Sequence, residues 1–276
     1  MAYVAQNSKF YQNYFADNKV NVAEIKSLKD LHLLPFTNKE DIQNHNQDFI
    51  CVPTEKIIDY VTSSGTTGEP ITIALSDKDL ERLAVNESNS FTITGGSAKD
   101  IYQLMVTIDR RFMAGMAYFL GARKLCAGIV RVGNGIPELQ WDTIKRISPS
   151  TIICVPSFIL KLIEYAEVHD IDYKNSSIKS AICVGEPLRN NDFSLNKLAV
   201  KIKEKWDIQL FSTYASSEMG AAFTECAAGN GGHLQPELLL IEIVDDEGIQ
   251  VKSGEYGELV VTTLGVETMP LIRFKT

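Results

Sequence analysis

The stretch VTSSGTTGEP at residues 61–70 concentrates hydroxyl side chains and glycines between two apolar runs. Gly65 and Gly68 permit a close approach of ligand to backbone, and successive backbone N–H groups in such a loop can form an anion-binding concavity. No Gly-Lys-Ser/Thr follows, which excludes the Walker phosphate loop. A solvated hairpin tip is the alternative, but the doubled threonine between glycines favours phosphate. Four hydroxyls would add donors: Ser63, Ser64, Thr66 and Thr67.

Two further stretches follow strand-like runs and offer groups that suit a nucleotide. In STYASSEMG, residues 212–220, Tyr214 could stack on a planar base, Ser217 could donate to a phosphate, and Glu218 could hold Mg²⁺, which prefers oxygen ligands. In CVGEPL, residues 183–188, a Gly-Glu-Pro turn exposes backbone groups. Ligands of open α/β sheets bind beyond the carboxyl ends of strands. Each stretch alone is equally compatible with an ordinary surface turn.

A glycine-rich loop at residues 225–237, ECAAGNGGHLQPE, contains the candidate zinc ligands Cys226 and His233. A structural zinc site needs four ligands, and the sequence does not choose between Glu225 and Glu237 to extend this pair. A free thiol and a solvated imidazole are the alternative, which the small number of ligands favours.

The elements that position these stretches alternate between strands and helices. Such alternation predicts parallel strands with crossover helices, an α/β fold with parallel or mixed sheets flanked by helices. After about residue 220 the pattern becomes strand and turn, which predicts a β-rich, antiparallel segment. The expected organisation is therefore a helical lead-in at 1–56, an α/β core at 57–219 and a β-rich segment at 220–276.

The individual elements follow from apolar periodicity and helix-start signals. In the helix expected at 76–91, Ser76 serves as N-cap and Asp79 is the third residue beyond it, a capping-box-like pair. The expected strands are 57–63, 71–75, 101–107, 127–132, 150–155, 178–185 and 207–214, and the other helices 111–122, 136–147, 156–170 and 194–206.

Composition limits the classes of protein that need consideration. The formal net charge of -8 disfavours a nucleic-acid partner or an anionic membrane surface, and no apolar run approaches the roughly 20 residues of a membrane span. The five cysteines lack paired spacing, and Cys126, Cys154 and Cys183 lie in apolar, strand-like runs. Buried free thiols in a reducing cytoplasm are the expected reading.

Taken together, the motifs resemble the adenylate-forming superfamily of acyl-CoA ligases, and within it the phenylacetate-CoA ligase-like branch. SSGTTG and the Tyr-x-x-Ser-Glu motif, about 150 residues apart with α/β alternation between them, carry the resemblance to the superfamily. The branch is indicated by VPSF and VGEP, and further stretches match in order from DLHLLPFTNKEDI to GEYGELVVTTL and PLIRFKT.

The resemblance implies ATP and a small carboxylic acid as substrates, Mg²⁺ as cofactor and coenzyme A as co-substrate. Residues 63–68 would hold the β- and γ-phosphates, with Thr66 in a catalytic role, and Ser217 would contact the α-phosphate while Glu218 coordinates Mg²⁺. Walls of the acyl pocket would come from residues 111–118, from 156–158 and from Ala215. The adenine would lie against four residues: Gly185, Glu186, Pro187 and Tyr214.

Departures from the pattern qualify this expectation. Ile71 stands where many superfamily members have Lys, and RRFMAGMAYFLGA replaces the branch's glycine-rich acyl segment, so an aryl acid such as phenylacetate is a family default. Relatives continue past Arg-Phe-Lys-Thr with a ribose-binding Asp and a lid domain with a catalytic Lys. The expectation is an N-terminal AMP-binding portion with partial activity, cytoplasmic and a candidate homodimer. The alternative is a non-catalytic or degenerate nucleotide-binding module.

Overall fold

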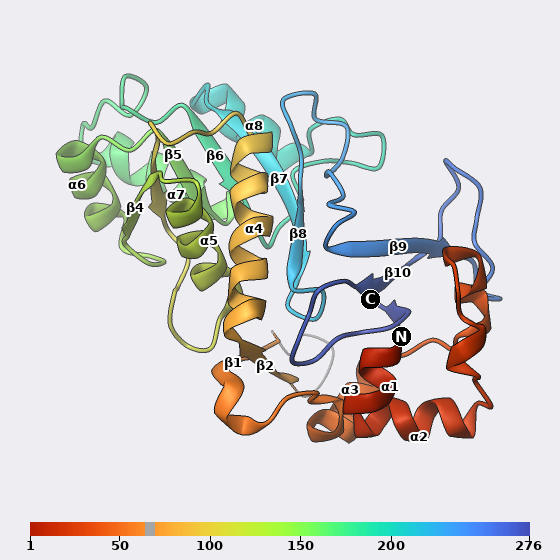
Figure 1. Ribbon diagram of the computed structural model, residues 1–276. Helices are drawn as coiled ribbons and strands as arrows, with labels where there is room; N and C mark the ends of the chain where they lie inside the picture. Colours follow the sequence, from red (N-terminus) through yellow and green to blue (C-terminus); the bar gives the residue numbers. More distant parts are fainter. Residues whose placement is uncertain (64–69) are drawn as a thin grey trace. The chain divides into compact units, whose positions relative to one another are not determined.

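The computed structural model describes residues 1–63 and 70–276, which form two compact units (Figure 1). The first unit contains Met1–Arg82, Ser217–Met219 and Gln235–Thr276. The second contains Leu83–Ser216 and Gly220–Leu234. Chain segments that are remote in sequence therefore share each unit.

The second unit is built on a six-stranded sheet with strand order β4-β3-β5-β6-β7-β8. The first five of these strands are mutually parallel, and β8 is antiparallel to β7. This mixed sheet confirms the predicted α/β fold class. Its strands are β3 (Ile101–Leu104), β4 (Gly128–Arg131), β5 (Thr151–Cys154), β6 (Ser180–Cys183), β7 (Gln209–Ser216) and β8 (Ala221–Thr224).

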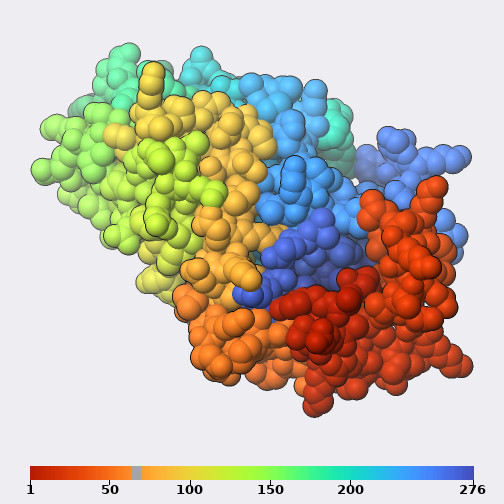
Figure 2. Space-filling view, in the orientation of Figure 1, coloured from red at the N-terminus to blue at the C-terminus, as the bar shows by residue number. Residues whose placement is uncertain are grey.

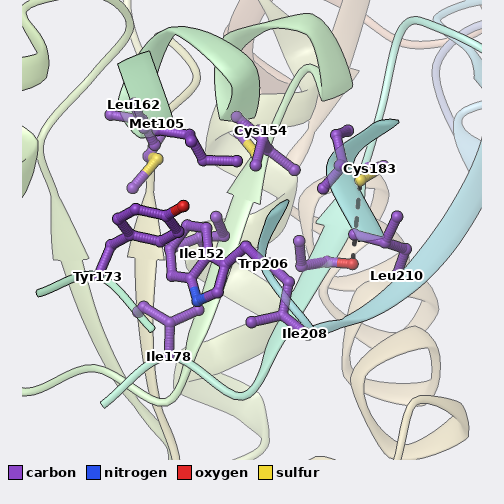
Figure 3. Close-up of a cluster of buried hydrophobic side chains, with 14 of the residues drawn as sticks. Met105, Ile152, Cys154, Leu162, Tyr173, Ile178, Cys183, Trp206, Ile208 and Leu210 are labelled. Carbon is purple, nitrogen blue, oxygen red and sulfur yellow. Dashed lines mark hydrogen bonds between the residues drawn. The ribbon is translucent and has the colours of Figure 1, made fainter. Parts of the chain in front are cut away.

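Helices cover both faces of this sheet, because its central strands are apolar on both sides. On one face, Ile152 and Cys154 of β5 pack with Trp206 in a large apolar cluster (Figure 3). On the other face, Ile153 packs with Phe91 and Tyr118. Successive strand residues point to opposite faces, so a continuous apolar run builds two cores at once. The helices are α4 (Asp77–Ile93), which begins in the first unit, α5 (Met113–Lys124), α6 (Pro137–Ile147), α7 (Pro156–Val168) and α8 (Lys197–Lys205).

The two cores belong to different sets of helices. Helices α6, α7 and α8 contribute to the cluster around Trp206, whereas α4 and α5 contribute to the cluster around Tyr118. Residues of α4 and α5, yellow to yellow-green in Figure 2, form the surface over that second cluster. The helices that precede β4 in the chain, α4 and α5, thus cover one face of the sheet, and the helices that follow β4 cover the other.

The first unit combines a hairpin, a small antiparallel sheet and the N-terminal helices. Strands β1 (Ile57–Thr62) and β2 (Thr72–Ser76) pair antiparallel, with Val61 opposite Ile73. The three-stranded sheet has the order β11-β10-β9, from β9 (Leu239–Val244), β10 (Glu258–Thr263) and β11 (Phe274–Lys275). The helices are α1 (Ala2–Asn7), α2 (Lys9–Asp17) and α3 (Lys39–His45), with 3₁₀ turns at Val22–Glu24, Leu28–Leu33, Asn46–Phe49 and Thr54–Lys56.

Two buried charged side chains tie remote segments of the first unit together. The Asp79 carboxylate accepts hydrogen bonds from the Ser76 backbone N–H and hydroxyl and from the backbone N–H groups of Glu267 and Thr268. The first two bonds, with the Asp79 N–H donated back to the Ser76 hydroxyl, confirm the predicted capping pair. The last two extend it to residues almost 190 positions away.

The second tie is the Arg273 guanidinium. It donates to both carboxylate oxygens of Glu242, at 3.0 and 2.9 Å, and to the backbone oxygen of Leu34, and it lies 4.0 Å from the centre of the Phe36 ring. The part of the β-rich segment from Gln235 onward and the helical lead-in are therefore packed into one unit.

Two sequence-based expectations change in detail. The expected strand at 101–107 is shorter than predicted: β3 ends at Leu104, and Met105–Thr107 follow its carboxyl end. The expected burial of Cys126 is wrong: the residue is exposed in the turn between α5 and β4, with φ of 61°. Cys154 and Cys183 are fully buried, as expected, and face each other in register on β5 and β6. No helix in residues 1–63 or 70–276 is long and apolar enough to cross a membrane.

Candidate active site

The strand order of the second unit creates a crevice between β3 and β5. After β3 the chain moves to β4 on one side and then returns to β5 on the other side of β3. The helices that follow these two strands, α5 and α7, consequently pack on opposite faces of the sheet. Such a reversal point is where open α/β sheets bind ligands, just outside the carboxyl ends of the strands.

A cavity of about 550 Å³ occupies this position. Val106 and Thr107 follow β3, Val155 follows β5, and Ile136 and Pro137 begin α6 after β4. Ligand pockets typically combine such a volume with a mostly apolar wall and a few polar groups. The remaining wall is formed by Met105, Phe112, Asn134, Gly135, Phe158 and Lys161.

The cavity includes only part of the expected acyl pocket. Phe112 and Phe158 line it, whereas Tyr118 is buried in the apolar layer beneath α5. The sequence reading missed the wall that residues 134–137 form, although these residues follow a predicted strand, which is the signal that could have found them. It also missed Lys161, because a lysine in an amphipathic helix is usually just a solvated side chain.

The turn after β6 contains the expected Gly185, Glu186 and Pro187. Gly185 has φ of 83°, a left-handed conformation that favours glycine. The Glu186 carboxylate accepts two hydrogen bonds of 2.8 Å, from the Ser157 backbone N–H and from its hydroxyl. A carboxylate at this helix start satisfies free N–H groups and complements the helix dipole. Glu186 therefore fixes the turn after β6 to the first turn of α7, beside the cavity wall.

Strand β7 presents the expected aromatic residue at its exposed end. The Tyr214 side chain is 54% exposed, and its ring stacks on the ring of Phe223, its cross-strand partner on β8, with centroids 6.1 Å apart. Ala215, next on the strand, is also exposed and pairs with Ala222. The phenol thus has a rigid backing and one free face, which suits stacking on a planar ring.

Ser217 and Glu218 lie in the turn after β7, within the first unit, and both are half-buried. In the described part of the chain the Glu218 carboxylate has neither a hydrogen-bond nor an ion-pair partner. A half-buried carboxylate with open lone pairs suits a hard cation such as Mg²⁺.

The hydroxyl-rich loop is described only at its base. Ser63 is buried, its N–H donates to the Ile71 oxygen, and its hydroxyl accepts from the Ile71 N–H, at 3.0 Å each. Ser63 thus closes the β1–β2 hairpin, and its hydroxyl already has a protein partner. The other expected phosphate-binding residues lie outside the described residues: Ser64, Gly65, Thr66, Thr67 and Gly68.

The loop around Cys226 and His233 is held by an ion pair. The Arg189 guanidinium donates to both carboxylate oxygens of Glu225, at 2.6 and 3.0 Å, and that carboxylate also accepts from the Ser212 N–H. Both oxygens of the Glu225 carboxylate therefore already have protein partners. Within residues 1–63 and 70–276, no group of three or more His, Cys, Asp or Glu side chains could hold a metal ion. The described side chains do not fit a zinc site.

The second unit also contains a buried acid that the sequence analysis did not single out. Glu87 of α4 is 5% exposed, and its Oε2 atom has no hydrogen-bond partner. Burial raises the pKa of this carboxyl to about 8. Gly121 of α5 lets the two helices approach closely here, since a Cβ at Gly121 would lie 2.4 Å from the Glu87 Cβ.

An open α/β sheet with a cavity at its reversal point has the arrangement in which α/β proteins bind ligands. Residues 15–269 match the family model of AMP-binding enzymes. The chain belongs to that family.

Curated relatives carry the description phenylacetate-coenzyme A ligase. The protein of Aromatoleum evansii is 30% identical over 276 residues, which cover 98% of this chain and 61% of the relative. That of Escherichia coli (strain K12) is 29% identical, with 98% and 62% covered. The chain thus spans about three fifths of the length of these relatives.

Solved structures share the fold. An open conformation of 2-hydroxyisobutyryl-CoA ligase, in complex with 2-HIB-AMP and CoA, superposes with a TM-score of 0.88 at 21% identity, covering 99% of this chain and 65% of that one. ATP-bound MatB from Rhodopseudomonas palustris gives 0.59 at 14% identity, covering 81% and 42%. These likenesses confirm the architecture expected of the large domain of adenylate-forming enzymes.

Proposed function

We propose that this protein activates a small carboxylic acid with ATP and passes the acyl group to coenzyme A. The observation that supports this most directly is the cavity at the reversal point of the sheet, in a member of the AMP-binding enzyme family. A carboxylate oxygen of the acid attacks the α-phosphorus of ATP, and pyrophosphate leaves. The coenzyme A thiolate then attacks the acyl carbon, and AMP leaves.

In this proposal, the described residues of the candidate site bind the adenine ring and the acyl group. The exposed face of Tyr214 stacks on the adenine, and Gly185, Glu186 and Pro187 border the same ring. The acyl group occupies the cavity between Phe112 and Phe158. An aryl acid such as phenylacetate is the first candidate, because the relatives have that name. Pre-positioning of the two reactants supplies much of the rate acceleration in such a reaction.

Neutralisation of the phosphate charge would be the second contribution to the rate acceleration. Glu218 would hold Mg²⁺, which would neutralise phosphate charge during the attack. Ser217 donates from the adjacent position to the α-phosphate in this scheme, and residues 63–68 hold the leaving pyrophosphate. In this scheme the chain's own donors would stabilise the charge that develops on the phosphates, which is a large source of rate acceleration in such reactions.

The test is acid-dependent exchange of labelled pyrophosphate into ATP, combined with thermal shift in the presence of ATP. Tyr214→Ala should weaken ATP binding about 5- to 100-fold, since stacking of one base is worth roughly 1–3 kcal/mol. Tyr256→Ala is the matched control, because Tyr256 is also an exposed tyrosine, at 84%. ATP binding without acid-dependent exchange would favour the alternative of a nucleotide-binding module. No response to ATP would refute the nucleotide site.

A further inference from the structure

Among the described residues that line the reversal-point cavity, Lys161 is the one that is charged. The structure describes eleven lining residues within 1–63 and 70–276, and the other ten are uncharged and mostly apolar. Lys161 lies on α7, three positions after Phe158, so the two side chains are neighbours on one face of the helix. The cavity therefore combines an aromatic wall with a single positive charge.

The Lys161 ammonium is not neutralised by the protein. In the described part of the chain it has no carboxylate within ion-pair distance. None of the described residues that line the cavity is a carboxylate. A lysine can lay its methylene stem along an apolar wall and keep its ammonium hydrated. The charge is thus available to an anionic group of a ligand, and the ammonium remains partly solvated beforehand.

We propose that Lys161 makes this cavity selective for carboxylic acids whose acyl part carries a second anionic group. The inference rests on the proposed function, because it assumes that the cavity accepts the acyl part of the substrate. One carboxylate is needed for the reaction with ATP, so a second negative charge is what the free ammonium can recognise. An aromatic or aliphatic body fills the space along Phe112 and Phe158, and the distal anion pairs with Lys161.

The size of the selectivity follows from the exposure of the lysine. Partly solvated ion pairs contribute modestly, since water and salt screen them. The dianionic acid should therefore bind about two- to fivefold more tightly than its monoanionic parent at low salt. The advantage should shrink as the salt concentration rises.

The experiment compares phenylacetate with 4-carboxyphenylacetate, which adds one carboxylate to the same ring. Dissociation constants are measured by titration calorimetry at pH 7 and low salt for wild type, Lys161→Met, Lys161→Arg and the control Lys145→Met. Lys145 is an exposed lysine of α6 that does not line the cavity. The preference for the dianion should disappear in Lys161→Met and persist in Lys161→Arg and Lys145→Met.

The outcomes separate this inference from the proposed function. Binding of both acids with the same ratio of dissociation constants in wild type and Lys161→Met would overturn the role of Lys161 and leave the acyl cavity standing. Equal weakening of both acids by Lys161→Met would also overturn it, because the lysine would then hold the reacting carboxylate. Failure of wild type to bind either acid would overturn the acyl cavity itself.

Discussion

Replacing Glu87 by glutamine should change how the stability of the protein depends on pH. The folded-state pKa of Glu87 is about 8, raised by burial from an ordinary value of 4.5. Below pH 4.5 the carboxyl is protonated in both folded and unfolded chains, and the full stability is present. Between pH 4.5 and 8 the unfolded chain releases the proton while the folded chain retains it, so the free energy of unfolding falls as pH rises.

The magnitude follows from these two pKa values. One pKa unit corresponds to about 1.4 kcal/mol. Integrated from pH 5 to pH 8, the release of this one proton lowers the free energy of unfolding of wild type by about 3 to 4 kcal/mol. Glutamine has nearly the same shape and does not titrate here. Its buried amide N–H groups need acceptors and shift the whole curve by a constant amount, which leaves the pH dependence as the informative quantity.

The assay is urea denaturation of wild type and Glu87→Gln at several values between pH 5 and pH 8. The difference between the two free energies of unfolding should move by about 3 to 4 kcal/mol in favour of the variant across that range. Glu164→Gln, an exposed change on α7, is the control and should run parallel to wild type. Parallel curves for wild type and Glu87→Gln would refute the claim that Glu87 is buried as a neutral acid.

Two further substitutions test the ties that hold each unit together. Arg189→Met should lower the free energy of unfolding by about 3 to 5 kcal/mol, because it leaves the Glu225 carboxylate buried without its partner; a loss below about 1 kcal/mol in urea denaturation would contradict this. Asp79→Asn should cost about 2 kcal/mol or more, because an amide cannot accept the four hydrogen bonds of the carboxylate with the same strength. The exposed neighbour Asp77 gives the control Asp77→Asn, and equal thermal denaturation of both variants would argue against the tie.

The sequence predicted the features of the fold that depend on residues near one another in the chain. The alternation of strands and helices, the mixed sheet and the Ser76–Asp79 cap follow from periodicity and from hydrogen bonds between residues near in sequence. The motif positions followed in the same way: Gly185 lies in the turn after β6, and Tyr214 lies exposed on β7.

The periodicity and motifs of the sequence could not predict contacts between residues that are remote in the chain. Nothing in VGEP shows that Glu186 caps the helix at Ser157, and nothing around Glu225 shows its pairing with Arg189, because both contacts depend on strand order. The same holds for Lys161 and Glu87. Each has the sequence signature of a solvated helix residue, and its environment is set by a helix or strand that the pattern does not place. The burial of Cys126 was predicted wrongly for a related reason. The apolar run after it forms β4, an edge strand with no buried residue, and the pattern does not show that the strand lies at an edge.

The rates at which the free cysteines react with a thiol reagent can report the unfolding of each unit. Cys126 is exposed, whereas Cys51 is buried in the first unit and Cys154 and Cys183 are buried in the second. Burial raises the pKa of Cys51 to about 12, and the neighbouring Cys154 thiol together with burial raises that of Cys183, so these thiols react only after exposure. A thiol reagent added under native conditions should modify Cys126 at once. The later modification of Cys51 and of the Cys154–Cys183 pair would time the opening of each unit separately, and so reveal whether the two unfold as one cooperative body or in sequence.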